Sequence, residues 1–325
     1  MKKITWLHIS DLHIDASEDT DNSIVRDAFL NDIEERLNSG ISFDFIVVTG
    51  DVANKGKAKD YIIANDFFKR LLEKVKLDEK RIFIVPGNHD LDRGKISKKN
   101  GGVFLNELVN GKNNARINDI IDSVFLESCK YKFTEYYKKI SNNRYEVKNK
   151  LLGNYYEELE VDGEKIGIVG VNSAWLSQGK GNIENFHMAV GEKQIRELVD
   201  FGDLNKNSLN ICLYHHPMST WLEFDRTKGL LKSKFDFLLC GHFHEPGSTI
   251  DAINSSVELQ AGALYNSREY HNGYSICEFY PDLYEDNVKL ILRVYSDNEG
   301  GFFAPDNISY KNSENGEMRF TLKKK

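Results

Sequence analysis

Five short groups of residues with metal-binding side chains occur in order along the chain, and each follows a run rich in Val, Ile, Leu or Phe. The groups are Asp11-Leu12-His13, Gly50-Asp51, Gly87-Asn88-His89-Asp90, His215-His216 and Gly241-His242-Phe243-His244. Carboxylate, amide and imidazole groups suit borderline divalent cations such as Mn, Fe, Zn or Co. The groups contain no Cys, which argues against a Cys-rich structural zinc site. These residue types therefore indicate a reaction assisted by bound metal ions.

The number of these side chains favours two metal ions over one. The groups offer more ligands than a single ion can use while it keeps a vacant position for a substrate. Two ions that share one bridging carboxylate would use the ligands economically. Ions about 3.5–4 Å apart recur in enzymes of displacement at phosphorus, because they polarise the phosphoryl oxygens and lower the pKa of a bound water. We therefore expect two divalent or mixed-valence metal ions (Mn, Fe or Zn) as cofactors.

In the first half of the chain, strand-like runs alternate with amphipathic helical segments. The runs at residues 4–9, 43–48 and 82–85 are typical of buried strands, and apolar residues at helical spacing predict helices at 24–37 and 64–75. This alternation predicts parallel strands joined by right-handed crossovers. Ligands bind outside the carboxyl ends of such strands, so the five groups are expected to converge on one site.

The second half of the chain is richer in predicted strands. Strands at 155–161 and 165–171 are expected to form a hairpin, because the Asp162-Gly163 pair between them favours a type I′ turn. We further predict a short helix at 194–198, strands at 209–214 and 235–240, and antiparallel strands at 257–261, 274–279 and 288–295. We interpret residues 1–295 as one domain and residues 296–325, which are polar and rich in Gly and Asn, as a peripheral C-terminal extension.

The composition is that of a globular protein. The 325 residues are 40% hydrophobic and 29% charged, with a net charge of −7, which excludes a disordered chain. The four Cys show no paired spacing, so reduced thiols are expected. We find no signal peptide and no apolar stretch of membrane-spanning length, and we expect a cytoplasmic protein that does not act at a membrane.

The motif series resembles the calcineurin-like metallophosphoesterase superfamily over residues 4–244. The segments 45–51 and 85–90 are similar to its bacterial cyclic-nucleotide phosphodiesterase-like branch. The resemblance implies an α/β fold of two packed mixed β-sheets flanked by helices, here with a helical insertion. It also implies seven metal ligands and a shared carboxylate. By the resemblance, the first ion is held by Asp11, His13 and His244, the second by Asn88, His215 and His242, and Asp51 bridges the two.

The same resemblance suggests roles for the neighbours of the ligands. His89 is expected to stabilise the transition state or to protonate the leaving oxygen, with Asp90 orienting it. In the pair of adjacent histidines, the family ligand lies two residues before a proline, here Pro217, which favours His215. His216 would then lie behind the ligands or face the substrate.

Residues 94–150 interrupt the pattern directly after the third group. They contain 12 Lys and Arg against 6 Asp and Glu, and part of the segment has helical spacing. We interpret them as a basic helical cap insertion that attracts an anionic substrate through charges such as those of Lys130, Lys132, Lys138 and Lys139. The alternative is an ordinary helical insertion with a solvated lysine face. Arg93, just before the insertion, is a candidate contact for a substrate phosphate.

The favoured function is a metal-dependent phosphoric ester hydrolase that cleaves a small or nucleotide-type phosphodiester by in-line attack of a metal-bound hydroxide. The alternatives are a nuclease acting on DNA or RNA, a phosphomonoester or protein phosphatase, and a non-catalytic scaffold. The isoelectric point near 5.8 weighs against a nucleic-acid partner. Among the other histidines, His8 is expected to be packed and hydrogen-bonded, and His187 and His271 to be exposed.

Overall fold

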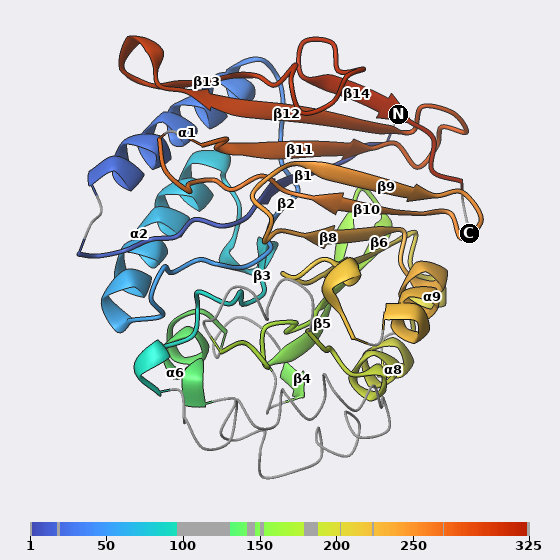
Figure 1. The fold of residues 1–325 in the computed structure, drawn as a ribbon. Helices are drawn as coiled ribbons and strands as arrows, with labels where there is room; N and C mark the ends of the chain where they lie inside the picture. Colours follow the sequence, from blue (N-terminus) through green and yellow to red (C-terminus); the bar gives the residue numbers. More distant parts are fainter. Residues whose placement is uncertain are drawn as a thin grey trace.

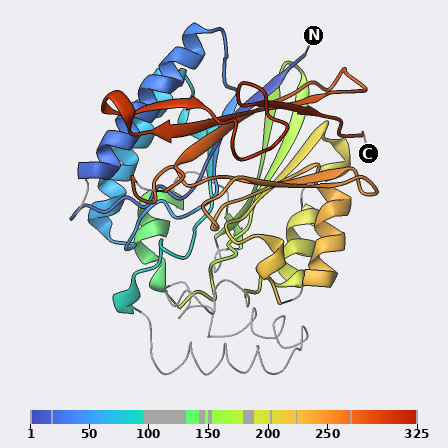
Figure 2. The ribbon, with the colours of Figure 1, turned by 45° about the horizontal axis from the view of Figure 1, so that its top comes forward.

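Two mixed β-sheets pack against each other, and helices cover the outer face of each sheet (Figure 1). The computed structural model describes residues 2–17, 20–95, 131–141, 147–149, 153–178, 188–201, 203–222, 224–268 and 270–323. Figure 2 shows α1 and α2 on one side of the paired sheets and α8 and α9 on the other. The expected α/β sandwich of two flanked sheets is confirmed.

The first sheet has the strand order β13-β12-β11-β1-β2-β3, and β14 also pairs with β12. Its strands are β1 (Ile4–Ile9), β2 (Phe45–Val48), β3 (Ile82–Ile84), β11 (Gly273–Phe279), β12 (Val288–Ser296), β13 (Phe302–Pro305) and β14 (Glu317–Phe320). The first three run parallel, because α1 (Thr20–Asn38) and α2 (Ala58–Val75) return the chain to the same end of the sheet. The predicted β-α alternation is confirmed.

The second sheet has the order β4-β5-β6-β7-β8-β10-β9. Its strands are β4 (Val147–Asn149), β5 (Asn154–Val161), β6 (Glu164–Gly170), β7 (Leu209–Leu213), β8 (Phe237–Cys240), β9 (Gly247–Asp251) and β10 (Ser256–Gln260), with α8 (Glu192–Phe201) and α9 (Phe224–Lys234) as its helices. The β5–β6 hairpin turns at Asp162 and Gly163, which both have positive φ, as predicted. The expectation for residues 257–261 was incomplete, because β10 is antiparallel to β9 but parallel to β8.

Short helical segments join these elements. They are η1 (Glu79–Arg81), η2 (Arg93–Lys95), α6 (Thr134–Tyr136), η3 (Tyr137–Ser141), η4 (Leu204–Lys206), η5 (Met218–Thr220) and η6 (Asn298–Gly300). None of the helices in the described ranges is both long and apolar enough to cross a bilayer.

Alternation of side chains along the strands divides the core into three layers. In β1, Leu7 and Ile9 face the layer under α1 and α2, whereas Ile4 and Trp6 face the layer between the sheets. The Trp6 ring stacks on Phe45 of its own sheet at 5.6 Å and meets the edge of Phe237 of the second sheet at 4.9 Å. The ends of β1, β2 and β8 are therefore held in one rigid body.

The C-terminal residues belong to the first sheet, and the expectation of a peripheral extension was wrong. β13 and β14 both pair with β12, and Phe303 and Leu322 are each only 4% exposed. The Phe303 ring contacts Phe29 of α1 and Tyr274 of β11. These strands are short and lie at a sheet edge, where burial of one face leaves much of the sequence polar.

Only part of the predicted basic insertion lies within the described residues. α6 and η3 pack on α2, and the hydroxyl of Tyr136 donates to the carbonyl of Ile84 at 3.1 Å. Lys132 does not lie on a solvated face, because it is 3% exposed and its Nζ donates to the carbonyls of Trp175 and Ser177. Lys138 and Lys139 are exposed, and Lys130 lies outside the described residues.

A matched pair of substitutions tests the place of β13 in the core. Phe303→Ala is expected to lower the free energy of unfolding by about 3–5 kcal/mol, because it opens a cavity among aromatic rings. Phe302→Ala, at a side chain that is 43% exposed, is expected to change it by less than about 0.5 kcal/mol. Urea unfolding of both variants measures the difference. Equal losses of unfolding free energy would contradict the conclusion that residues 302–305 belong to the core.

Candidate metal centre

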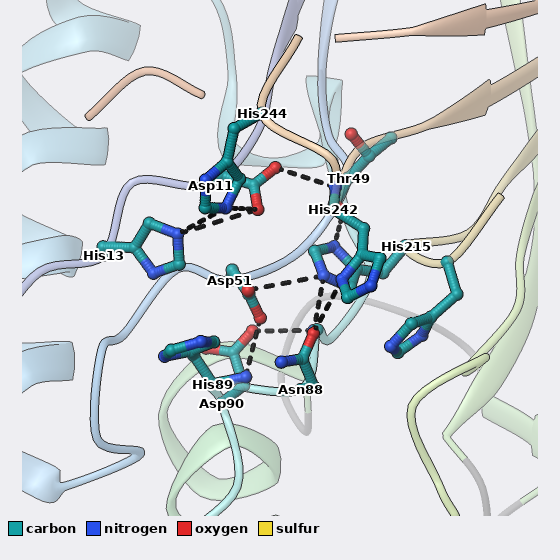
Figure 3. A network of polar contacts seen from close by, with 12 residues as sticks. Asp11, His13, Thr49, Asp51, Asn88, His89, Asp90, His215, His242 and His244 are labelled. Atoms are coloured by element: carbon teal, nitrogen blue, oxygen red, sulfur yellow. Dashed lines mark hydrogen bonds and ion pairs between the residues drawn. The ribbon is translucent and has the colours of Figure 1, made fainter. Parts of the chain in front are cut away.

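Loops at the carboxyl ends of five strands meet at one edge of the sandwich (Figure 3). Asp11 follows β1, Asp51 follows β2 and Asn88 follows β3 in the first sheet; His215 follows β7 and His242 follows β8 in the second. The structure therefore brings together all five groups that the sequence singled out. Asp11 and His215 are fully buried, Asp51, Asn88 and His13 are buried, and His242 and His244 are partly exposed.

The first set of candidate ligands consists of Asp11, His13 and His244. The Nε2 atoms of His13 and His244 are 3.2 Å apart. Oδ1 of Asp11 lies 3.3 Å from Nε2 of His244 and 3.7 Å from Nε2 of His13. These three donor atoms form a compact triangle, with two residues from the loop after β1 and one from the loop after β8.

The second set contains Asn88, His215 and His242, and it lies beside the first. Oδ1 of Asn88 is 3.0 Å from Nε2 of His215 and 3.1 Å from Nδ1 of His242. Oδ2 of Asp51 is 3.3 Å from Nε2 of His215. Asp51 groups with Asp11 and His215 on one side and with His13 and His89 on the other. Its carboxylate is thus placed to be shared.

These distances fit donor atoms that surround common cations. Ligands about 2.1 Å from a metal lie roughly 3.0 Å apart at octahedral neighbours and roughly 3.4 Å apart at tetrahedral ones. In addition, Nδ1 of His215 donates to the carbonyl of Thr49 at 2.7 Å, so Nε2 of a neutral ring carries a lone pair. Nε2 faces two acceptor oxygens, of Asn88 and Asp51, so it needs a positive charge there, either a proton on Nε2 or a metal ion in its place.

The same reasoning separates the two adjacent histidines. Oγ of Ser173 accepts the backbone N–H groups of His215 and His216, so its own hydrogen is directed to Nδ1 of His216 at 3.1 Å. Nδ1 of His216 is then an acceptor, and its buried Nε2 carries the hydrogen. A protonated Nε2 does not bind a metal. These hydrogen bonds support His215 as the ligand and leave His216 with a donor group beside the site.

Burial and charge set the protonation states. Burial lowers the pKa of His13 to about 3 and that of His242 to about 4, which favours the neutral, metal-binding imidazole. Burial opposes ionisation of Asp51, but the neighbouring imidazoles outweigh it and hold the pKa of its carboxyl well below its usual range. Burial also lowers the pKa of His215, yet the carboxylates of Asp51 and Asp11 raise it to about 9. The site therefore demands positive charge next to Asp51.

The backbone of the site is strained. Of the 11 non-glycine residues with positive φ in the described ranges, five are candidate ligands. They are Asp11, His13, Asp51, His242 and His244, with φ between 45° and 78°. Left-handed conformations are unfavourable for such residues and concentrate at functional sites, where surrounding contacts enforce them. Bonds from the amides of Asp11 and His13 to the carbonyls of Gly50 and Asp51, both 3.0 Å long, are among these contacts.

Two motif glycines allow the loops to approach each other. A Cβ at Gly87 would lie 2.0 Å from Oδ1 of Asp51, and a Cβ at Gly241 would lie 2.0 Å from Oγ of Ser10 and 2.6 Å from Oδ2 of Asp11. Any other residue at either position would displace a candidate ligand.

His89 lies at the same edge, but Asp90 does not orient its ring as expected. The Asp90 carboxylate accepts bonds from the amides of Gly87, Val52 and Ala53 and from the hydroxyl of Tyr61. It thereby fixes the loops that carry Asp51 and Asn88.

The partner of the His89 ring is Asn54, which the sequence analysis missed. Nδ1 of His89 lies 3.1 Å from both the carbonyl oxygen and Oδ1 of Asn54. Nδ2 of Asn54 in turn donates to Asp15, whose carboxylate also pairs with Lys55 at 2.6 Å. The only sequence signal was the proximity of Asn54 to Asp51, three residues earlier, in a loop without a striking composition.

The remaining candidates have mixed outcomes. His8 is buried and bonded to Thr49 at 3.0 Å, as expected. His271 was expected to be exposed, but it is half-buried and bonds Asp306 at 3.0 Å, because the C-terminal strands bring Asp306 to it. Arg93 is exposed in η2, and His187 lies outside the described residues.

Comparison with known proteins agrees with this geometry. The model of the Calcineurin-like phosphoesterase family matches residues 4–246 of the chain. The crystal structure of a dimetal phosphatase from Danio rerio superposes with a TM-score of 0.54 at 12% identity, covering 98% of this chain and 99% of that one. This likeness shows a shared fold.

Two curated proteins are similar in sequence. The metallophosphoesterase-like protein YydB of Bacillus subtilis is 24% identical over 337 residues, which cover 98% of this chain and 65% of YydB. The 3′,5′-cyclic adenosine monophosphate phosphodiesterase CpdA of Haemophilus influenzae is 26% identical over 187 residues, which cover 57% of this chain and 62% of CpdA. The matched region thus spans less than two thirds of the length of either relative.

Replacement of the shared carboxylate tests the centre. Asp51→Asn keeps the shape of the side chain but removes its charge, so we expect the purified protein to lose both equivalents of bound Mn²⁺. Asp251→Asn, which changes a carboxylate paired with Lys232 away from the site, should keep the wild-type metal content. Metal content after equilibrium dialysis distinguishes the two. Wild-type Mn²⁺ binding by Asp51→Asn would show that Asp51 is not a metal ligand.

Proposed function

Since the chain belongs to the calcineurin-like phosphoesterase family, we propose that it hydrolyses phosphodiesters at the edge where the five loops meet. The chain is a metal-dependent phosphoester hydrolase, as this family is. The observation that carries the proposal is the position of Asp51 between two sets of candidate ligands, with His89 beside it. The backbone amide of His89 donates to Oδ1 of Asp51 at 2.7 Å, which ties the two groups together.

The charge of the site supports a diester rather than a monoester. Within the described part of the chain, Asp11, Asp51 and Asn88 contact imidazoles and backbone amides, and no guanidinium group contacts them. A phosphodiester carries a single negative charge and so needs less compensating charge than a monoester dianion, for which Arg side chains are well suited. The named activity of the CpdA relative, a cyclic-nucleotide phosphodiesterase, agrees with this choice.

Seven residues fit the metal positions that the family implies. Asp11, His13 and His244 would hold one cation, Asn88, His215 and His242 the other, and Asp51 both. Two bound cations supply Lewis-acid charge that polarises the phosphoryl group and activates a water molecule. Mn, Fe and Zn all accept this set of oxygen and nitrogen donors.

His89 is placed to move a proton. The backbone carbonyl of Asn54 can only accept, so Nδ1 of His89 carries a hydrogen in either charge state. Nε2 is therefore the atom that can give a proton to the leaving oxygen. Asn54 holds the ring, and the bond from its Nδ2 to Asp15 fixes which end of the amide faces His89.

An exposed aromatic ring next to the ligands supports a substrate with a flat leaving group. Phe243 stands between His242 and His244, is 42% exposed, and has its ring centroid 5.2 Å from that of His242. The residues on both sides of Phe243 are in the left-handed conformation. Such a ring can stack a nucleobase or another planar group of the substrate.

Substrate assays test the reaction. With Mn²⁺ we expect the wild type to hydrolyse bis-p-nitrophenyl phosphate with a higher kcat/KM than p-nitrophenyl phosphate. Cyclic AMP is then assayed in the same way as a nucleotide diester. His89→Ala should lower kcat about 10²- to 10⁴-fold, the usual share of a positioned general acid, with unchanged Mn²⁺ content. A higher kcat/KM for the monoester, or no turnover of any of these substrates, would overturn the proposal. A preference for single-stranded DNA would keep the diester chemistry but favour the nuclease alternative.

A second assay tests the ring of Phe243. Phe243→Ala should raise KM for a nucleotide diester several-fold, on the order of the loss of one stacked base, and leave kcat within about twofold. Tyr284→Ala, at a side chain that is 88% exposed in the β11–β12 loop, is the matched control and should change neither constant. An unchanged KM in Phe243→Ala would exclude the stacking role.

A further inference from the structure

The loop of the first motif is held by a side chain from a different element. Asn22, in the first turn of α1, donates from Nδ2 to the carbonyl of Leu12 at 2.8 Å and to that of His13 at 3.2 Å. Asn22 is 2% exposed. Nη1 of the buried Arg26 donates to Oδ1 of Asn22, which directs the amide nitrogen toward the loop. The loop carries two candidate ligands, Asp11 and His13, both in the left-handed conformation.

The bonds of Asn22 supply donors to two carbonyls of this loop. The amides of Asp11 and His13 donate to the loop after β2, and the carbonyl of Asp11 accepts from the amide of Tyr265 at 3.1 Å. Only the carbonyls of Leu12 and His13 then need donors, and both are oriented by the left-handed turn. Asn22 supplies both donors from one nitrogen, so the turn that aims Asp11 and His13 inward depends on it.

Ser173 has the corresponding position on the other side of the site. It follows β6, is fully buried, and accepts the amides of His215 at 3.1 Å and His216 at 2.9 Å. Its hydroxyl hydrogen is directed to Nδ1 of His216. One oxygen atom thus fixes the backbone direction of the segment that carries the ligand His215 and the ring of the residue after it.

We infer that Asn22 and Ser173 are positioning residues, each of which holds one of the two metal positions through the main chain of its ligands. Asn22 serves the position of Asp11, His13 and His244, and Ser173 serves the position of Asn88, His215 and His242. Neither side chain is a ligand. The inference rests on the two-metal site proposed above and adds that the two positions have separate supports.

Metal titration of single variants tests this division. Asn22→Asp keeps the shape of the side chain, removes both N–H donors and turns a carboxylate toward two carbonyls. We expect the affinity for one of the two Mn²⁺ ions to fall about 10- to 100-fold, the usual effect of changing a partner of a metal ligand, and that for the other to stay within about threefold. Ser173→Ala should lower the Mn²⁺ affinity of the position formed by Asn88, His215 and His242 by a similar factor.

Matched controls distinguish positioning from general loss of stability. Asn31→Asp makes the same change at an exposed site of α1, and Ser177→Ala removes a buried hydroxyl without a hydrogen-bond partner from the loop of Ser173. Both controls should bind two Mn²⁺ ions with wild-type affinity. The electron paramagnetic resonance spectrum supplies a second readout, because the exchange-coupled signal of a Mn²⁺ pair should give way to that of isolated Mn²⁺ in Asn22→Asp and Ser173→Ala only.

Double variants assign each support to its position. In a His244→Ala background the first position is already lost, so Asn22→Asp should change the Mn²⁺ affinity of the remaining second position little. In a His242→Ala background the first position remains, and Asn22→Asp should weaken its Mn²⁺ affinity strongly. If Asn22→Asp does not fold, Asn22→Ala removes the same donors without a charge. Equal loss at both positions, or equal effects in both backgrounds, would overturn the inference. A wild type that binds a single Mn²⁺ would instead contradict the two-metal site itself.

Discussion

The buried carboxylate of Asp51 is the group on which the arrangement of the site depends. It is 1% exposed, accepts the backbone amide of His89, and lies 3.3 Å from the ring of His215. A carboxylate removed from water must be offset by positive charge or by hydrogen-bond donors. This requirement explains the surrounding imidazoles and the glycine at position 87, whose missing side chain leaves the carboxylate its space.

The fold meets this requirement by bringing strand ends from both sheets to one edge. Trp6 of β1 packs on Phe45 and Phe237, and so joins the strands that precede Asp11, Asp51 and His242. The ligand loops themselves adopt left-handed conformations that short polypeptides would not hold. Their strain is maintained by bonds between loops and by side chains of neighbouring elements, such as Asn22 and Ser173. The arrangement of the candidate ligands therefore depends on contacts between elements of both sheets.

The residues around the candidate ligands have different roles. Asp90 binds three backbone amides and the hydroxyl of Tyr61, so it supports the loops, while Asn54 holds the ring of His89. The two adjacent histidines differ in their hydrogen bonds, because Nδ1 of His215 faces a carbonyl and Nδ1 of His216 faces a hydroxyl. Phe243 lies between the candidate ligands His242 and His244 and is 42% exposed, which is why we propose that it contacts the substrate.

The sequence by itself determined the parallel β-α order, the five groups of candidate ligands and their place after strands, because apolar periodicity and residue type are local properties. Tertiary structure alone decided which neighbour orients His89, since the direction of Asn54 and Asp90 depends on loops that are distant in sequence. It also decided that Lys132 is buried and that residues 302–305 and 317–320 complete a sheet. Short edge strands and long polar side chains carry little periodic signal, and only their contacts with other elements fix their place.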